Sequence, residues 1–232
     1  MHYVIVDVET TGGNPKQSKI TEIAMYKYDG KKIIDELISL INPEQHIPEF
    51  IVRLTGITDK MVEKAPKFYE LAKDILAFCE GSIFVAHNVG FDYGMLRHEF
   101  QSLGYDFRFP HLCTVRASRY VIPGHASYSL GKLSADLSIQ IDGRHRAGGD
   151  ALATAQLFDL IYHKDPNHLA SFIQHEINPK KIHPKLNIHA VDDLPSKAGV
   201  YRFYDEFNAL IYIGKSKHIK KRVEQHLRNA ST

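Results

Sequence analysis

The chain has 232 residues, of which 44% are hydrophobic and 24% are charged, a balance that is typical of a folded globular protein and excludes a disordered one. No apolar run approaches the roughly 20 residues that a membrane-spanning helix needs, so we expect no membrane association. The net charge of +2 divides unevenly: residues 1–178 hold 18 Lys/Arg and 22 Asp/Glu, and residues 179–232 hold 11 Lys/Arg and 5 Asp/Glu. A basic tail on an acidic body favours a polyanionic partner, and a solvated basic surface is the plainer alternative.

Two further features bear on the compartment. The chain enters an apolar strand at residue 3, which leaves no room for a signal peptide. Cys79 and Cys113 are the only cysteines, and their apolar surroundings favour buried thiols over a disulfide. We therefore expect a cytoplasmic protein.

Three strands are predicted near the N-terminus. Residues 3–6 are β-branched and aromatic, as in a strand that is buried on both faces, and a glycine-rich turn follows at 12–15. Residues 20–28 and 32–41 are apolar or alternating, and Asp29-Gly30 between them is a hairpin signal. We predict that the three strands form an antiparallel meander.

The rest of the chain predicts helices that alternate with strands. Apolar spacing favours helices over 48–54, 66–79, 91–103, 115–121, 130–137 and 150–162, and strands at 82–87 and 112–113. Strands followed by strand–helix alternation indicate an α/β fold, with a mixed sheet and helices on its faces. Residues 163–187 are rich in Pro, Lys, His and Asn and are typical of a linker with at most one helix. Beyond it we predict strands at 199–204 and 210–213 and a basic helix over 218–227.

Two carboxylates interrupt the first strand. Asp7 and Glu9 stand two positions apart, so their side chains point to the same face of a strand. Like charges this close repel each other, and a cation between them removes the repulsion. For these two residues alone, an acidic surface turn is the plainer interpretation.

Other candidate residues are equally ambiguous when each is taken alone. Asp92 stands at the start of a predicted helix, and His145 and Asp150 stand in a loop that runs into the last long helix. A carboxylate at a helix N-terminus is an ordinary cap, and a histidine in an Arg/Gly loop is an ordinary surface residue. Contacts with phosphates and plain surface exposure explain several arginines equally well: Arg97, Arg116, Arg119 and Arg146.

Together, these residues resemble the three exonuclease motifs of the DEDDh family, the family of the proofreading subunit of bacterial replicative DNA polymerase. The motifs are Asp7-Val8-Glu9-Thr10-Thr11-Gly12, Asn88-Val89-Gly90-Phe91-Asp92, and His145 with Asp150 after four intervening residues. The match covers roughly residues 1–165, in order and at suitable spacing. It implies a ribonuclease H-like α/β fold, in which a mixed sheet flanked by helices carries the acidic site at one edge.

The resemblance also implies a chemistry. Carboxylates without a thiolate or imidazole cluster suit a hard ion, Mg²⁺ or Mn²⁺, and two such ions can flank a scissile phosphate. By the family's pattern Asp7 bridges both ions, Glu9 and Asp150 complete one site, and Asp92 serves the other. His145 is implied as the general base. The turn Thr10-Thr11 is implied to hold the terminal 3′-hydroxyl, and Phe91 to contact terminal bases, for which a core position is the alternative.

We therefore expect a 3′→5′ exonuclease that removes nucleotides from single-stranded or frayed DNA 3′ ends in proofreading or repair, with a DNA polymerase or repair protein as its candidate partner. Two alternatives stay open. One is an RNA-trimming exoribonuclease on the same scaffold, and the other is a catalytically silent module that recruits a polymerase or repair protein. The intact set of catalytic residues argues against the silent module.

The end of the chain resembles a second nuclease family, the GIY-YIG domain of the excision-repair incision subunit. The resemblance rests on Leu194-Pro195, Gly199-Val200-Tyr201, Ile211-Tyr212-Ile213-Gly214-Lys215 and the helix bearing Arg222. It implies that Tyr201, Tyr212 and Arg222 surround a phosphate, whereas the metal-holding glutamate belongs to a later helix, so only about half of that domain is present. The expected organisation is an exonuclease domain over 1–165, a linker over 166–187 and the N-terminal half of a GIY-YIG domain over 188–232.

Overall fold

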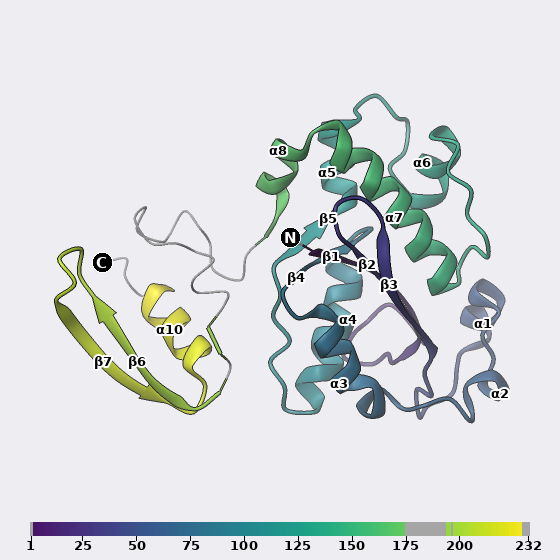
Figure 1. Ribbon diagram of the computed structural model, residues 1–232. Coiled ribbons are helices and arrows are strands. Elements are labelled where there is room, and N and C mark those ends of the chain that lie inside the picture. Colours follow the sequence, from purple (N-terminus) through teal and green to yellow (C-terminus); the bar gives the residue numbers. More distant parts are fainter. Residues whose placement is uncertain (1, 175–193, 196, 229–232) are drawn as a thin grey trace. The chain divides into compact units, whose positions relative to one another are not determined.

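The computed structural model describes residues 2–174, 194–195 and 197–228, and the chain divides into two compact units, Met1–Gln174 and His175–Thr232 (Figure 1). The first unit is built on a five-stranded sheet, and the second contains a two-stranded sheet and a helix. Cys79 and Cys113 are both buried free thiols, as predicted. Among the described residues, no helix is both long enough and apolar enough to cross a membrane.

The sheet of the first unit is mixed and has the order β3-β2-β1-β4-β5. Its strands are β1 (His2–Thr10), β2 (Ile20–Tyr28), β3 (Ile33–Leu40), β4 (Ser82–Ala86) and β5 (His111–Cys113). β2 pairs antiparallel with both β1 and β3, which confirms the predicted meander, and β4 pairs parallel with β1 and β5. The central position therefore belongs to β1, the strand that carries the two candidate carboxylates.

The helices of the first unit cover both faces of this sheet. They are α1 (Glu49–Thr55), α2 (Asp59–Val62), α3 (Phe68–Cys79), α4 (Gly90–Ser102), α5 (Thr114–Val121), α6 (Leu130–Asp136), α7 (Ala147–Lys164), α8 (Pro166–Leu169) and a 3₁₀ turn, η1 (Ala170–Phe172). The sequence does not predict α2 or η1, because a helix of one turn carries no periodic apolar signal. α8 and η1 fall in the segment assigned to the linker, but they lie in the first compact unit, which ends at Gln174.

Alternation along β1 divides the core into two layers. Val4, Val6 and Val8 pack with apolar residues of α3 and α4 on one face, and Tyr3 and Ile5 pack with residues of α5 and α7 on the other. Side chains two positions apart share a face, so Asp7 and Glu9 belong to the layer of Tyr3 and Ile5. The two carboxylates therefore continue the face of the sheet that α7 covers (Figure 1).

The start of α7 differs from the prediction. Two glycines argue against a helix before Asp150, yet the helix begins at Ala147 and includes both of them. A Cβ atom on Gly149 would lie 1.9 Å from the carbonyl oxygen of Asp142, so only glycine lets the preceding loop fold back onto the first turn. Asp150 consequently lies inside the first turn of α7 and is not its cap.

The described part of the second unit is a hairpin with a helix packed on it. Its elements are β6 (Gly199–Tyr204), β7 (Leu210–Ser216) and α10 (Ile219–Arg228), close to the predicted strands and helix. Tyr201 of β6 is buried against Ile219 and Val223 of α10. A Cβ atom on Gly214 would lie 2.2 Å from the Tyr201 ring, so this glycine makes room for the tyrosine between strand and helix.

Candidate active site

Three carboxylates of the first unit converge where β1 ends. Asp7 and Glu9 come from β1, and Asp150 comes from the first turn of α7, which packs on that face of the sheet. One ligand oxygen from each lies within 4.8 Å of the others, a spacing that one metal ion could bridge. All three side chains are half-buried. Among the described residues, this is the one group of three or more such side chains close enough to hold an ion.

The fourth carboxylate reaches the site from a different element. Asp92 stands in the first turn of α4, which follows β4, the parallel neighbour of β1. It is only 3% exposed, and its Oδ1 accepts a hydrogen bond of 3.2 Å from the backbone N–H of Val8. This bond holds the N-terminus of α4 against β1 at Val8, the residue that lies between Asp7 and Glu9.

Burial raises the pKa of every carboxyl group in the cluster, and repulsion by neighbouring carboxylates adds to the rise for Asp7, Glu9 and Asp92. For Asp7, burial raises the pKa well above its usual range, and the charges of Asp92, Glu9 and Asp150 raise it further. Burial also raises the pKa of Glu9 to about 7 and that of Asp92 to about 8. The pKa of Asp150 is raised by burial, which outweighs its hydrogen bond from His145. Bound positive charge would therefore stabilise the ionised forms of these four carboxyl groups.

The donor set fits a hard divalent cation. Asp150 Oδ1 is buried and has no hydrogen-bond partner among the described residues, so one carboxylate oxygen stands ready for a ligand. All donors in the cluster are carboxylate oxygens, which suit Mg²⁺ and Mn²⁺ better than the softer metals that take thiolate and imidazole. Asp7, Glu9, Asp150 and Asp92 are therefore the residues that would hold metal here.

We expect the metal-free protein to lose stability as the pH rises from about 5 to 9. The folded-state pKa values of Glu9 and Asp92 are raised to about 7 and 8, above the unfolded values near 4. The folded state then binds more protons over this range, so the free energy of unfolding falls as the pH rises through these pKa values. Thermal melts in a chelator test this, and saturating Mn²⁺ or the Asp92→Asn change should flatten the slope. A metal-free melting temperature that climbs with pH would contradict it.

His145 lies beside the cluster on a strained piece of backbone. Its φ of 60° is in the left-handed region, which residues other than glycine rarely adopt. Its backbone N–H donates a 3.1 Å hydrogen bond to Oδ2 of Asp150, whereas its half-exposed imidazole has no hydrogen-bond partner among the described residues. The contacts recorded for His145 therefore fix its backbone and not its ring by hydrogen bonds.

A cleft of about 330 Å³ opens over the carboxylates. The structure brings Asp7, Glu9, Thr10, Phe91, Asp92 and Asp150 into its lining, whereas Thr11 and His145 are not part of it. Sequence reasoning missed four of the residues that line the cleft: Gly13, Ile51, Leu54 and His87. Gly12 and Asn88, which also line it, belong to the quoted motifs but were assigned no role. Leu54 carried no signal, because it is an exposed residue of a short helix, whereas His87 directly precedes the second motif and could have been found.

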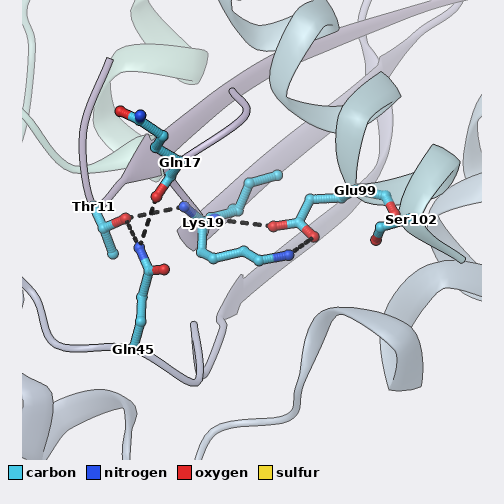
Figure 2. A network of polar contacts seen from close by, with 7 residues as sticks. Thr11, Gln17, Lys19, Gln45, Glu99 and Ser102 are labelled. Carbon is cyan, nitrogen blue, oxygen red and sulfur yellow. Dashed lines mark hydrogen bonds and ion pairs between the residues drawn. The ribbon is translucent and has the colours of Figure 1, made fainter. Parts of the chain in front are cut away.

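The hydroxyl of Thr11 is engaged within the protein. Its Oγ1 accepts a 2.9 Å hydrogen bond from the backbone N–H of Lys19 and another from Nε2 of Gln45 (Figure 2). Lys19 in turn forms a 2.8 Å ion pair with Glu99 of α4, a carboxylate that is 4% exposed. These bonds join the turn after β1 to α4, and they leave Thr10, whose hydroxyl donates to the carbonyl of Gly12, as the threonine that faces the cleft.

Removing Lys19 should destabilise the fold. In Lys19→Met the carboxylate of Glu99 stays buried without its 2.8 Å partner, and stranding a buried charge costs about 1–3 kcal/mol or more. Urea unfolding monitored by circular dichroism gives the change. The double variant Lys19→Met/Glu99→Met should recover most of it, and equal stability of parent and Lys19→Met would show that the pair contributes nothing.

In the second unit the three predicted residues, Tyr201, Tyr212 and Arg222, lie close to a fourth, His226. Tyr201 and Tyr212 lie on paired strands with ring centroids 6.0 Å apart, and a hydrogen bond from Arg222 lowers the pKa of Tyr201 while burial and Tyr212 raise it more. His226, which sequence reasoning missed, lies one helical turn after Arg222, and its Nε2 is 2.8 Å from the Tyr201 hydroxyl. The signal available in the sequence was this i, i+4 spacing.

A mixed sheet of this order, with helices on both faces and an acidic cluster at the end of its central strand, defines a nuclease of the ribonuclease H-like class. The chain belongs to the exonuclease family, whose sequence profile matches residues 4–158. Families of this type are metal-dependent. A second profile, the UvrC-like GIY-YIG domain, matches residues 197–232.

Curated relatives share one or both parts. The chain is 40% identical over 166 residues to the 3′-5′ exonuclease DinG of Bacillus subtilis (strain 168), which covers 70% of this chain and 18% of the relative. It is 32% identical over 240 residues to a protein named as a bifunctional exonuclease/endonuclease of Mycobacterium tuberculosis (strain CDC 1551 / Oshkosh), covering 97% of this chain and 37% of that protein. It is 34% identical to the DNA polymerase III subunit epsilon of Aquifex aeolicus (strain VF5), covering 67% of this chain and 78% of the subunit. The chain thus spans well under half of the first two relatives.

Among solved structures, exonuclease X in complex with 5′-overhanging duplex DNA superposes with a TM-score of 0.59 and 27% identity. The superposition covers 73% of this chain and 96% of exonuclease X. The predicted fold and the predicted family are confirmed.

Proposed function

We propose that the first unit is a metal-dependent 3′→5′ exonuclease that removes nucleotides from single-stranded or frayed DNA 3′ ends. The observation that carries the proposal is the convergence of Asp7, Glu9, Asp92 and Asp150 on one cleft, three of them within 4.8 Å. The names of the relatives, which include a 3′-5′ exonuclease and a DNA polymerase subunit, support the same direction of attack.

In this mechanism the four carboxylates would hold two ions, Mg²⁺ or Mn²⁺, which would supply positive charge to polarise the scissile phosphate and stabilise the leaving 3′-oxygen. Asp7 would contribute to both sites, Glu9 and Asp150 would complete one, and Asp92 would complete the other. The raised pKa values of these acids ensure that metal binding and proton release are coupled. His145, on its left-handed backbone beside Asp150, accepts a proton from the attacking water.

The walls of the cleft suit a chain end. Thr10, Gly12 and Gly13 form a polar floor from the turn after β1, where the terminal 3′-hydroxyl is proposed to bind. Ile51 and Leu54 on α1 and Phe91 on α4 form an apolar side against which an unpaired base can pack. A volume of about 330 Å³ accommodates one terminal nucleotide better than a continuous duplex.

The decisive assay uses matched 5′-labelled single-stranded DNA and RNA of one sequence, with Mn²⁺ and with chelator. The proposal expects metal-dependent laddering of DNA from the 3′ end. Preference for RNA would favour the RNA-trimming alternative, and no laddering of either strand would favour a silent recruitment module. A 3′-phosphorylated DNA strand is the matched control, because a site that reads a free 3′-hydroxyl should degrade it more slowly.

The cellular role is also a proposal. Relatives that are polymerase subunits favour proofreading, and the appended GIY-YIG part favours repair, so the proposed partner is a DNA polymerase or a repair protein in the cytoplasm. Affinity capture uses the Asp7→Asn protein, which should bind DNA without cutting it. Whether a DNA polymerase or a repair protein is retained after nuclease treatment of the lysate distinguishes the two roles.

We propose that the second unit, with a boundary near residue 188, binds nucleic acid and does not cut it. Tyr201, Tyr212 and Arg222 are gathered there, but the group of acidic side chains that could hold an ion among the described residues, Asp7, Glu9 and Asp150, belongs to the first unit. Its exposed basic residues include Lys215, Lys217 and Lys221. Nicking of supercoiled plasmid by the Asp7→Asn protein with Mg²⁺, abolished by Tyr201→Phe, would overturn this proposal.

Deletion of residues 175–232 should separate binding from catalysis. Residues 179–232 hold 11 basic and 5 acidic side chains, and loss of this charge removes phosphate contacts without touching the carboxylate cluster. We expect turnover on strands of a few nucleotides to stay within about twofold, while the dissociation constant for long strands rises about tenfold at low salt and little at high salt. Fluorescence anisotropy at two salt concentrations measures this, and a salt-independent loss would contradict it.

A further inference from the structure

A fifth carboxylate, that of Glu22, adjoins the cluster, but other residues bind both of its oxygens. Glu22 of β2 pairs directly with Glu9 across the β1–β2 ladder, on the face that α7 covers, and is only 4% exposed. Its charge raises the pKa of both Asp7 and Glu9, so it works against ionisation of the cluster. A buried carboxylate in this place is costly unless both of its oxygens are satisfied.

Both oxygens of Glu22 are bound by residues at the start of α7. Arg146 binds them side-on through one edge of its guanidinium group, with Nη2 donating to Oε1 at 2.6 Å and Nε donating to Oε2 at 3.0 Å. The backbone N–H of Ala147, the first residue of α7, donates to Oε2 at 2.9 Å. Arg146 is the N-cap residue of α7 but does not cap it with its own side chain, so Glu22 supplies the cap from another element.

These contacts constrain the backbone of His145, the residue before Arg146. His145 has a φ of 60°, and no hydrogen bond to its imidazole exists among the described residues. Its backbone is held on one side by the 3.1 Å bond to Asp150 and on the other by the grip of Arg146 on Glu22. An otherwise unfavourable backbone conformation persists only where neighbouring contacts impose it.

We infer that Glu22 and Arg146 are positioning residues for His145: their bidentate ion pair anchors the start of α7 to β2 and thereby sets the backbone that holds His145 beside Asp150. The inference rests on the proposed role of His145 as general base. It also gives Arg146 a task other than contact with the phosphates of the substrate.

The test compares Glu22→Gln with the parent on 5′-labelled single-stranded DNA at saturating Mn²⁺. Glutamine keeps an acceptor for Ala147 but loses the charge and the second acceptor oxygen that bind Nε and Nη2 of Arg146. We expect kcat at pH 7 to fall about 10–100-fold, as for other partners that orient a catalytic side chain, with KM within about twofold. The deficit should narrow near pH 9.5, where hydroxide replaces the base. Calorimetry should find Mn²⁺ affinity within about threefold of the parent's.

Glu22→Gln in a His145→Ala background tests whether Glu22 acts through His145. If Glu22 acts through His145, Glu22→Gln should now change kcat by less than about twofold, because coupled residues are not additive. A full 10–100-fold loss in that background, a parent-like kcat of Glu22→Gln alone, or a loss explained by weaker Mn²⁺ binding would each overturn the inference. A parent-like kcat of His145→Ala alone would instead show that the proposed general base is wrong.

Two further variants keep the test decisive. Should Glu22→Gln fail to fold, Arg146→Lys replaces it, because lysine keeps the charge but cannot bind two oxygens side by side, and a pH-dependent loss of kcat is again expected. Arg53→Gln is the matched control: its side chain is 71% exposed, and it pairs with Glu49 at 3.4 Å on the surface of α1. This variant should retain the parent's kcat and pH profile.

Discussion

Asp7→Asn should abolish exonuclease activity while leaving the fold intact. Asp7 lies on the central strand, shares the cleft with Glu9, Asp92 and Asp150, and is the carboxylate that the mechanism assigns to both ions. Loss of its charge should remove several kcal/mol of transition-state stabilisation, so we expect the rate on single-stranded DNA to fall more than about a thousandfold. Single-turnover kinetics with Mn²⁺ give this number directly.

The same substitution should stabilise the metal-free protein. Burial and the neighbouring carboxylates raise the pKa of Asp7 well above its usual range, so its charged form is unfavourable in the folded state above neutral pH. Asparagine removes that repulsion, and each kcal/mol gained should raise the melting temperature by about 2–4 °C in a domain of this size. Asp74→Asn, at an exposed position of α3, is the control and should change neither property. Parent-like cleavage by Asp7→Asn would refute the metal assignment.

His145→Ala should lower the rate by about two to four orders of magnitude, the usual contribution of a positioned general base. The loss should shrink as the pH rises, because hydroxide needs no base. Mn²⁺ affinity should survive, since the cluster of Asp7, Glu9 and Asp150 contains no imidazole. pH–rate profiles and calorimetric titration measure the two effects.

The control for this variant lies on α7, the helix that follows His145. His163→Ala removes a histidine that is 57% exposed near the end of α7, so it should leave the rate unchanged. Collapse of Mn²⁺ affinity in His145→Ala would make His145 a metal ligand, and a pH-independent loss would indicate that the ring orients substrate.

Local sequence was sufficient for the elements and for part of the site. The β-branched run of β1 with Asp7 and Glu9 two positions apart predicts two carboxylates on one face, because the period of a strand depends on backbone geometry alone. The hairpin signal at Asp29-Gly30 likewise predicts the β2–β3 pairing that the structure contains. Motif spacing identified Asp92 and Asp150 as further candidates, although no local rule brings them to β1.

Contacts between distant segments decided the rest. Asp150 reaches Glu9 because α7 packs its Ala147 and Ala151 onto β2, and Asp92 reaches β1 because β4 is the parallel neighbour of that strand. The sequence offered Arg146 as a candidate for phosphate contact, yet its guanidinium is bound to Glu22, which lies 124 positions away in the chain. Such a pairing has no signature in either segment.

What the sequence determined by itself about this protein is therefore its strands, its longer helices and the identity of the acidic residues, since these follow from side-chain periodicity and residue chemistry. The tertiary structure alone decided which oxygens remain available to a metal, which threonine faces the cleft, and what holds the backbone of His145. Thr11 and Glu22 are satisfied by partners from other elements, whereas Asp150 keeps one buried oxygen unpaired. The physical reason is that hydrogen-bond satisfaction belongs to pairs of groups, and the pairs form only when the chain has folded.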